Sequence, residues 1–416
     1  MSQLSPARRA AFRILLRVET RAAYAVELLN ADPATQLSPA DHALAQELVM
    51  GCLRRQGELD WLIQHYSGKD PARFDAEVRV ILRMGVYQIR CLERIPARAA
   101  VDQSVELTRH AGKASATALV NAVLRKVRRD VIAMPETVRL STPQWLLDRW
   151  GPEIAARNLE RPVTFLRVPP GASIDWQRGS HGLPGDTGDL ARGSYVRNCV
   201  IAPQGMRPDL PIQDEGSQIV PYLLDARDPH WILDLCAAPG NKTAAIAELA
   251  PEAHIVAADL YPVRLRLVGA GMRVALDSAA ALPFTRLFDR ILLDAPCSGT
   301  GTVRRNPEIK WRLRPEDLTD LAARQTALLE NAIGALAPGG RLVYSTCSLE
   351  PEENERVVEP VLARHPEVRL RAAIGERDRL RDALTPEGLA LLGDPYFHVS
   401  PSAHGADGFF AAILEK

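Results

Sequence analysis

The sequence has few cysteines, and they form neither a metal-binding nor a disulfide pattern. Six cysteines occur among 416 residues, and no two are separated by only two residues. Disulfide frameworks and zinc sites need closely spaced cysteines, so we expect no metal and a reducing, cytoplasmic environment. No apolar run approaches the ~18 residues of a transmembrane helix, so no membrane partner is expected. The run from Ala10 to Val18 is interrupted by Arg13 and Arg17, which predicts a helix with a charged face and not a signal peptide.

The chain also lacks net charge, because 51 basic residues balance 51 acidic residues. This balance excludes a uniformly basic nucleic-acid-binding surface. It hides an asymmetry, however. Residues 1–130 contain 20 lysines and arginines against 14 aspartates and glutamates, a net charge of +6, and residues 131–416 carry −6. A basic N-terminal third predicts an anionic partner for that part of the chain.

Three regions follow one another along the sequence. Residues 1–130 carry apolar residues at helical spacing and no useful strand pattern, which predicts an all-α bundle. Within it, Ser38 followed by Pro39 and Asp41 marks a helix start. Residues 131–210 predict a short α+β segment or linker.

Two expectations concern the detail of that segment. Strands are expected at 163–168 and 195–202, and a Gly-rich loop is expected at 179–193.

Residues 211–416 alternate between short apolar runs and helical patterns, which predicts an α/β Rossmann-like domain with a mainly parallel, twisted sheet. The expected strands are 231–235, 255–258, 274–276, 290–293, 341–345 and, as a last edge strand, 409–414.

One turn in this domain is typical of a ligand-binding loop. Residues 233–243 read Leu-Asp-Leu-Cys-Ala-Ala-Pro-Gly-Asn-Lys-Thr, so a buried strand leads into small residues and then a helix. Ala237, Ala238 and Gly240 allow a ligand to approach the backbone and the helix N-terminus. Neither GxGxxG nor GxxxxGK[ST] is present, which disfavours dinucleotide and P-loop binding.

Acidic residues follow the next two strands. Asp259 lies 19 residues after Gly240, the position from which a carboxylate contacts ribose hydroxyls. Asp277 follows the third strand and is placed to meet an adenine amino group. Together with the small-residue turn, these acids predict a bound nucleoside.

Two cysteines occupy ends of later strands. Residues 294–299 read Asp-Ala-Pro-Cys-Ser-Gly, and Cys347 follows the strand at 341–345. The Ser/Gly/Thr loop around Cys297 is poor core material, which disfavours a merely buried cysteine. Because both cysteines follow successive strands of one sheet, Cys297 and Cys347 are expected near one another at its carboxyl edge. A disulfide remains open at this point, whereas the lack of a histidine at ligand spacing disfavours zinc.

At these motifs the sequence resembles the RNA cytosine-C5 methyltransferases. The segments that carry the resemblance are Gln-Asp-Glu-Gly-Ser-Gln at 213–218, the turn at 236–242, Asp-Ala-Pro-Cys-Ser-Gly at 294–299, Thr-Cys-Ser at 346–348 and Pro-Glu-Glu-Asn at 351–354. The N-terminal region is similar to the antitermination factor NusB. This pairing resembles the bacterial 16S ribosomal RNA methyltransferases that make 5-methylcytidine at cytosine 967.

The resemblance implies a set of roles. Cys347 is the nucleophile that adds to C6 of cytosine, Cys297 serves product release, and Asp294 hydrogen-bonds the base. The implied cofactor is S-adenosyl-L-methionine, and the implied contacts are Cys236, Ala237, Ala238, Pro239, Gly240, Asn241, Lys242, Asp259, Asp277 and Asp294. Asn241 departs from the family, which has a second glycine there. The role of Lys242, to hold the cofactor or to assist the thiol, stays open.

An RNA substrate is consistent with the basic residues. Arginine stripes are expected on two helices: Arg9, Arg13 and Arg17 on one, and Arg79, Arg83, Arg90 and Arg94 on the other. Further RNA-binding candidates are Arg304, Arg305, Lys310 and Trp311, because basic residues beside an aromatic ring hold phosphates and stack bases. We expect 16S rRNA or a small-subunit precursor as partner of a monomeric protein.

Other functions remain to be weighed. A tRNA cytosine-C5 methyltransferase would use the same catalytic parts. A DNA cytosine methyltransferase would use Cys297 as nucleophile and would not need Cys347. A non-catalytic RNA-binding assembly or antitermination factor would not need these thiols with Asp259 and Asp294.

Overall fold

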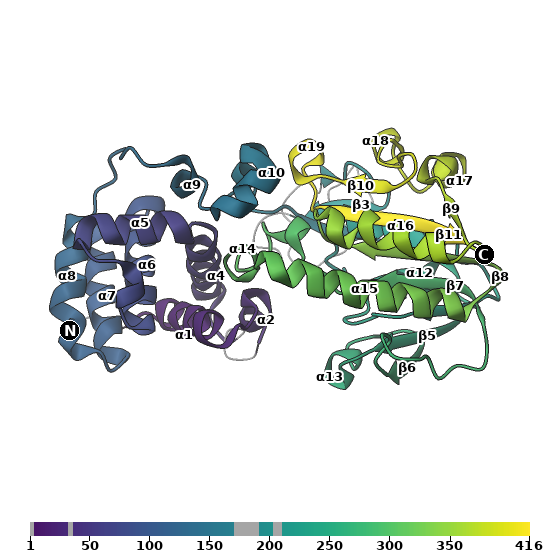
Figure 1. Cartoon of the computed structure of the whole chain (residues 1–416). Helices are drawn as coiled ribbons and strands as arrows, with labels where there is room; N and C mark the ends of the chain where they lie inside the picture. Colours follow the sequence, from purple (N-terminus) through teal and green to yellow (C-terminus); the bar gives the residue numbers. More distant parts are fainter. Residues whose placement is uncertain (1–3, 32–35, 170–190, 203–209) are drawn as a thin grey trace. The chain divides into compact units, whose positions relative to one another are not determined.

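The computed structural model divides into two compact units (Figure 1). It describes residues 4–31, 36–169, 191–202 and 210–416. The helical unit comprises residues 1–161 together with 303–312, and the sheet unit comprises 162–302 and 313–416. The predicted middle segment, 131–210, is thus divided between the two units. The short stretch 303–312 belongs to the helical unit although the chain on both sides of it belongs to the sheet unit.

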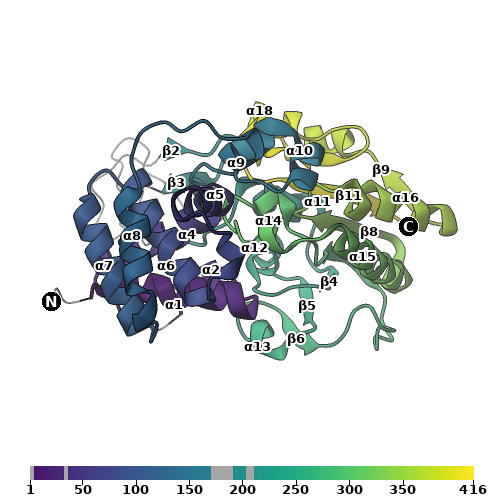
Figure 2. The same cartoon turned by 60° about the vertical axis from the view of Figure 1, so that its left-hand side comes forward.

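The helical unit is built from packed amphipathic helices. They are α1 (Pro6–Arg21), α2 (Ala25–Leu29), α4 (Pro39–Arg54), α5 (Gln56–Ser67), α6 (Ala76–Cys91), α7 (Ala97–His110), α8 (Thr117–Lys126), α9 (Glu136–Arg139), α10 (Gln144–Arg157) and α14 (Ile309–Arg312), with 3-10 turns η1 (Pro71–Arg73) and η2 (Ala114–Ala116). Helix α1 packs on α4 and α6, and α6 packs on α7 and α8 (Figure 2). The predicted start of α4 is confirmed, because Ser38 Oγ accepts a hydrogen bond from the Asp41 N–H at 3.2 Å.

The stretch 303–312 caps the ends of two helices in this unit. Lys310 Nζ donates to the carbonyl oxygen of Arg54 at 2.8 Å, and Trp311 Nε1 donates to that of Leu53 at 2.9 Å. Arg312 donates to three carbonyl groups at the C-terminal end of α1. The last carbonyls of a helix have no partner within it, so this segment satisfies groups that α1 and α4 leave unpaired.

The sheet unit is organised around an eight-stranded sheet. Its strands are β4 (Trp231–Asp234), β5 (His254–Asp259), β6 (Met272–Ala275), β7 (Phe288–Asp294), β8 (Leu336–Thr346), β9 (Arg369–Arg371), β10 (Phe397–Val399) and β11 (Phe409–Glu415). The order is β10-β11-β8-β7-β4-β5-β6, with β9 also pairing with β11, and strands β4 to β8 are parallel. The predicted α/β architecture is confirmed. The expectation of an edge strand at 409–414 was wrong, because β11 lies between β8 and β10.

Both faces of this sheet are buried, because alternate side chains of the central strands pack into two different cores with the helices of the unit. The helices of this unit are α11 (Glu215–Leu223), α12 (Asn241–Leu249), α13 (Pro262–Leu265), α15 (Pro315–Ala335), α16 (Glu355–Arg364), α17 (Arg377–Leu380), α18 (Pro386–Ala390) and α19 (Pro401–His404), with 3-10 turns η3 (Thr300–Thr302), η4 (Pro351–Glu353) and η5 (Ala373–Glu376). Leu292 and Val343 belong to the core formed with α11 and α12, whereas Leu293 and Tyr344 belong to the core formed with α15 and α16. Burial on both faces explains why these strands read as continuous apolar runs.

A smaller antiparallel sheet precedes the main one. Its strands are β1 (Thr164–Arg167), β2 (Ala191–Arg192) and β3 (Cys199–Ala202), in the order β1-β3-β2. It matches the predicted strands at 163–168 and 195–202. The predicted loop at 179–193 falls mostly outside the described residues, and its end, at 191–192, is β2. Within the described ranges, no helix combines the length and apolar character needed to cross a bilayer.

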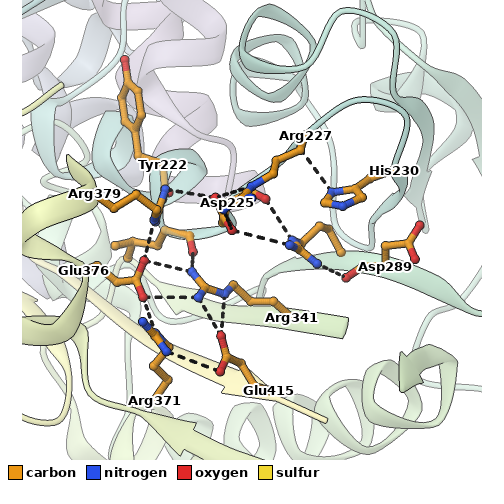
Figure 3. A network of polar contacts seen from close by, with 12 residues as sticks. Tyr222, Asp225, Arg227, His230, Asp289, Arg341, Arg371, Glu376, Arg379 and Glu415 are labelled. Atoms are coloured by element: carbon orange, nitrogen blue, oxygen red, sulfur yellow. Dashed lines mark hydrogen bonds and ion pairs between the residues drawn. The ribbon is translucent and has the colours of Figure 1, made fainter. Parts of the chain in front are cut away.

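The amino ends of the central strands carry a buried ionic network (Figure 3). Glu376 is 1% exposed, and its carboxylate accepts hydrogen bonds from Arg341, Arg371 and Arg379. Burial alone raises the pKa of Glu376, but these hydrogen bonds outweigh burial and lower the pKa to about 2. Arg341 also contacts Glu415 at 2.6 Å. This network joins β8, β9 and β11 at the end of the sheet.

Candidate active site

The carboxyl ends of β7 and β8 bring a lysine, an aspartate and a serine together. Asp294 ends β7 and lies beside Ser345 of β8 in the parallel register. One carboxylate oxygen of Asp294 lies 2.6 Å from Lys242 Nζ of α12, and the other accepts a hydrogen bond from Ser345 Oγ at 2.8 Å. Burial alone lowers the pKa of Lys242, but the Asp294 carboxylate outweighs burial and raises that pKa. Lys242 is therefore a fixed cation at this edge.

The two predicted thiols meet at the same edge. Cys297 lies in the loop after β7, Cys347 directly follows β8, and their Sγ atoms are 3.3 Å apart. The contact with Cys347, and then burial, raise the pKa of Cys297 well above its usual range. The Cys297 thiol is therefore hard to ionise. Negative charge on Cys347 also raises the pKa of Lys242, so the ammonium group lies within electrostatic reach of that sulfur.

Both thiols are free, and among the described residues they join no cluster of potential metal ligands. All six cysteines of the chain are reduced. In the part of the chain that the structure describes, no three His, Cys, Asp or Glu side chains are grouped to hold a metal ion. The pair at this edge is therefore available for nucleophilic chemistry.

The turn between β4 and α12 has the open backbone that its sequence predicts. Gly240 adopts φ 108° and a Cβ at this position would lie 2.9 Å from Val268 Cα, so both backbone conformation and space require glycine. Asn241 begins α12 without a positive φ, and its side chain donates to the Ile212 carbonyl at 3.3 Å. Asn241 therefore replaces the family's second glycine without backbone strain.

The two acids after β5 and β6 have different surroundings. The carboxylate of Asp259 accepts hydrogen bonds from the backbone N–H groups of Ala238 at 3.1 Å and Tyr261 at 2.9 Å. It is thereby fixed beside the β4–α12 turn. Asp277 is exposed and forms an ion pair with Arg324 at 3.3 Å. Its predicted contact with an adenine remains a prediction.

Sequence reasoning missed Asp234, the residue that ends β4. Its side chain is 1% exposed, and Thr243 Oγ1 donates to Oδ2 at 2.7 Å. Its other oxygen, Oδ1, is buried and has no hydrogen-bond partner among the described residues. Burial, followed by repulsion from Asp294, raises the pKa of Asp234 to about 7. The residue stands in the quoted 233–243 motif, but only the fold shows that one of its oxygens lacks a donor.

The prediction that the 304–311 stretch presents basic side chains to RNA was wrong for two of its residues. Lys310 is fully buried, and Arg304 is 4% exposed. Trp311 is partly buried and uses its N–H on the α4 carbonyl described above. The sequence could not distinguish the two cases, because a basic stretch beside a tryptophan has the same pattern whether it contacts RNA phosphates or helix carbonyl groups. For Arg305 the RNA-binding role stays a prediction.

The second expected arginine stripe was wrong in part: Arg94 is exposed but lies beyond the end of α6, and the other three members make internal contacts, Arg90 with backbone carbonyl groups. Arg79 and Arg83 both contact Glu19 at 2.5 Å, and Arg83 contacts Asp60 at 2.6 Å. The first stripe differs, because its members are exposed and make no ion pair within the described residues: Arg9, Arg13 and Arg17.

Comparison with known proteins agrees with both units. The family model for the 16S rRNA methyltransferases RsmB/F matches residues 221–415, and the model for the NusB family matches residues 5–129. The ribosomal RNA small subunit methyltransferase B of Erwinia tasmaniensis is 34% identical and aligns over 94% of both chains. The probable ribosomal RNA small subunit methyltransferase B of Bacillus subtilis is 30% identical over 98% of both chains. The chain belongs to the RsmB/F family of 16S rRNA methyltransferases.

A solved structure supports the fold. The crystal structure of PH0851 aligns over the whole of both chains with a TM-score of 0.79 at 24% identity. As an RsmB/F-family protein, this chain is an S-adenosylmethionine-dependent rRNA methyltransferase.

The residues of the β4–α12 turn fit such a cofactor. Gly240 leaves no room for a side chain, the carboxylate of Asp259 is fixed beside the turn, and Asp234 Oδ1 is a buried acceptor without a donor. A nucleoside with a charged amino acid part offers hydroxyl and ammonium donors to such carboxylates. The residues that would hold it are those of the turn at 236–240, with Asp259.

Proposed function

We propose that this chain methylates C5 of a cytosine in 16S rRNA, namely cytosine 967, through a covalent enzyme–RNA intermediate. The observation that carries this proposal is the pair of thiols, Cys297 and Cys347, whose sulfur atoms are 3.3 Å apart beside the Lys242–Asp294 ion pair. A single nucleophile would need only one thiol. Two thiols in contact support a reaction in which one adds to the base and the other assists its release.

The first step is addition of the Cys347 thiolate to C6 of the cytosine. A bond forms between sulfur and C6, and the electron pair of the C5–C6 double bond becomes available at C5. The Lys242 cation stabilises negative charge on the sulfur before attack. Asp294, oriented by Lys242 and Ser345, accepts a hydrogen bond from the amino group of the base. The base must leave its stack to reach these groups.

The second stage transfers the methyl group and releases the product. S-adenosylmethionine, when bound, would supply an electrophilic methyl group on a sulfonium centre, whose sulfur keeps the electron pair of the broken S–CH3 bond and leaves as a neutral thioether. After C5 has gained this methyl group, a base takes the C5 proton, the C5–C6 double bond re-forms and the bond from Cys347 to C6 breaks. Cys297 is the titratable side chain in contact with Cys347, and we assign it to this release stage.

The experiment that tests the function compares candidate RNAs. The purified protein is incubated with isotope-labelled S-adenosylmethionine and either 16S rRNA, small-subunit precursor or tRNA, and nucleosides are analysed by mass spectrometry. Labelled 5-methylcytidine in 16S rRNA supports the proposal. Label in tRNA alone would favour the tRNA enzyme, and no label in any RNA would favour a non-catalytic RNA-binding factor.

We also propose that the helical unit docks the RNA through α1. The exposed arginines Arg9, Arg13 and Arg17 support this role, because they have no carboxylate partner among the described residues. Each phosphate contact makes the logarithm of affinity fall with the logarithm of salt concentration by a slope of roughly 0.7–0.9.

Replacing these three arginines by glutamine should therefore lower the salt slope by about 2–3 and weaken RNA binding at low salt, with cofactor affinity unchanged. Arg98→Gln on α7, which changes an arginine that is 94% exposed, is the matched control. If the triple variant binds RNA as the control does, α1 is not the docking surface.

A further inference from the structure

A buried carboxylate lies between the two cysteine loops. Glu353, in η4, is fully buried. Its Oε1 accepts hydrogen bonds from the Ser298 N–H at 2.8 Å and from Gln325 Nε2 at 3.0 Å. Its Oε2 accepts hydrogen bonds from Ser298 Oγ and, at 2.5 Å, from Ser348 Oγ. An ionised carboxylate has only acceptors, so four donors give it a complete set of partners.

Two of these donors are the residues next to the two cysteines in the sequence. Ser298 directly follows Cys297, and Ser348 directly follows Cys347. One side chain thus binds the neighbour of each thiol, although the two thiols lie 50 residues apart in the sequence. Hydrogen bonds to a buried charge are stronger than neutral ones, so Glu353 is a rigid link between the two loops.

Glu353 is itself held in place from the strand that carries Cys347. The Tyr344 hydroxyl donates to the Glu353 carbonyl oxygen at 2.6 Å. Next to it, Asn354 accepts from Thr346 Oγ1 at 2.6 Å and donates to the Ser348 carbonyl at 3.0 Å. The link therefore has a fixed base on β8 and extends from there to the loop of Cys297.

We propose that Glu353 is a positioning residue that holds the sulfur atoms of Cys297 and Cys347 in contact. It acts through Ser298 and Ser348, and its effect on methyl transfer rests on the proposed function. A displacement of about 1 Å at a reacting group lowers rates by as much as ~10²-fold. Loss of the link should therefore affect every step in which the two thiols cooperate.

The test measures the separation of the thiols without any RNA. Diamide removes two electrons and two protons from a pair of nearby thiols, which forms one disulfide and reduces diamide to the hydrazine. The rate of Cys297–Cys347 disulfide formation, followed by mass spectrometry of unreduced peptides, reports how often the sulfur atoms meet. Glu353→Ala should slow this rate by roughly 10²-fold, and Glu353→Gln, which keeps one acceptor oxygen, by about 10-fold.

Activity provides the second readout. Both variants should lower kcat in parallel with the disulfide rate, while the affinity for S-adenosylmethionine stays at the wild-type value. Glu359→Gln, an exposed carboxylate on α16, is the matched control and should change neither rate. Should Glu353→Ala fail to fold, Ser298→Ala removes a single donor from the link and should slow disulfide formation a few-fold.

Two results would overturn the proposal. Wild-type disulfide rates in folded Glu353→Gln and Ser298→Ala would show that the carboxylate does not set the thiol separation. A lower melting temperature with unchanged disulfide rate and unchanged kcat would show a purely structural role. If the wild type methylates no RNA, the proposed function fails, but the disulfide rates still decide whether Glu353 positions the thiols.

Discussion

The two ends of the eight-stranded sheet both bury charged side chains, but they differ in how completely these charges are paired. At the amino end, Glu376 accepts hydrogen bonds from three arginines, which lower its pKa to about 2 although burial opposes this. At the carboxyl end, Asp234 has one oxygen without a partner among the described residues, and burial raises its pKa to about 7.

We interpret the charged groups at the amino end as stabilising the fold and those at the carboxyl end as serving the candidate active site. A fully paired buried network stabilises a single arrangement, whereas an incompletely paired group keeps the capacity to bind a ligand or move a proton. Changes of the thiols at the carboxyl end should therefore affect chemistry and spare stability, and changes of Glu376 at the amino end should do the reverse.

The largest expected effect is on the cysteines. Cys347→Ala should lower methyl transfer by about 10⁴-fold or more, because no other group adds to C6. Cys297→Ala should still form the covalent adduct with RNA but release it poorly. On denaturing gels with RNA and S-adenosylmethionine, a slowly migrating band is expected only for Cys297→Ala. The double variant should trap nothing.

Two results would contradict this division of roles. A trapped band from Cys347→Ala would make Cys297 the nucleophile. Full activity in both single variants would remove the thiol mechanism altogether.

The second-largest effect is expected at the amino end of the sheet, where a substitution should change stability and leave activity unchanged. Glu376→Gln should lower the free energy of unfolding of the sheet unit by about 3–5 kcal/mol, because it removes the buried charge that Arg341, Arg371 and Arg379 share. Chemical denaturation measures this loss. The kcat of the folded variant should equal the wild-type value. A lower kcat with unchanged stability would show that the amino end of the sheet is not purely structural.

The third effect is an opposite pH dependence at the two ends. The folded pKa of Glu376 lies below its ordinary value of 4.5, so its stabilisation is complete above that pH and lost as pH falls toward 2. The folded pKa of Asp234 lies above its ordinary value of 3.8, so stability falls as pH rises from about 4 to about 7. In denaturation curves across this range, Asp234→Asn should remove the fall between pH 4 and 7. The same slope in the variant would contradict the assignment.

The smallest effect should come from Glu415→Gln. This side chain is 38% exposed, and Arg341 keeps its contact with Glu376 when Glu415 is neutral. We expect a loss of about 1 kcal/mol or less, measured against Glu376→Gln under the same conditions. An equal loss in both variants would show that the stability contribution of a carboxylate in this network does not depend on how deeply it is buried.

The sequence predicted the parts of the site that depend on local pattern. Asp294, Cys297 and Cys347 follow apolar strands, and parallel strands place their carboxyl ends together. The sulfur contact follows from this arrangement, and the structure has it. Gly240 was predicted in the same way, as part of a strand–turn–helix pattern.

What the sequence could not show depends on partners far away in the chain. Lys310 is satisfied by a carbonyl group 256 residues earlier, which no local pattern reports. Glu353 stood in a quoted motif, but its hydroxyl partners come from two loops that only the fold brings together. The last strand was expected at the sheet edge, yet the short strands β10 and β9 both pair with it.

The inclusion of residues 303–312 in the helical unit has a consequence for how the protein is made. The N-terminal helices emerge from the ribosome first, but the donors that cap α1 and α4 are synthesised only after most of the parallel sheet. At about 5–20 residues per second, the chain between residues 161 and 303 takes roughly 7–30 s to translate. During that interval the nascent helices lack Lys310, Trp311 and Arg312, so α1 and α4 gain these hydrogen-bond donors only after strands β4 to β7 of the sheet unit have been synthesised.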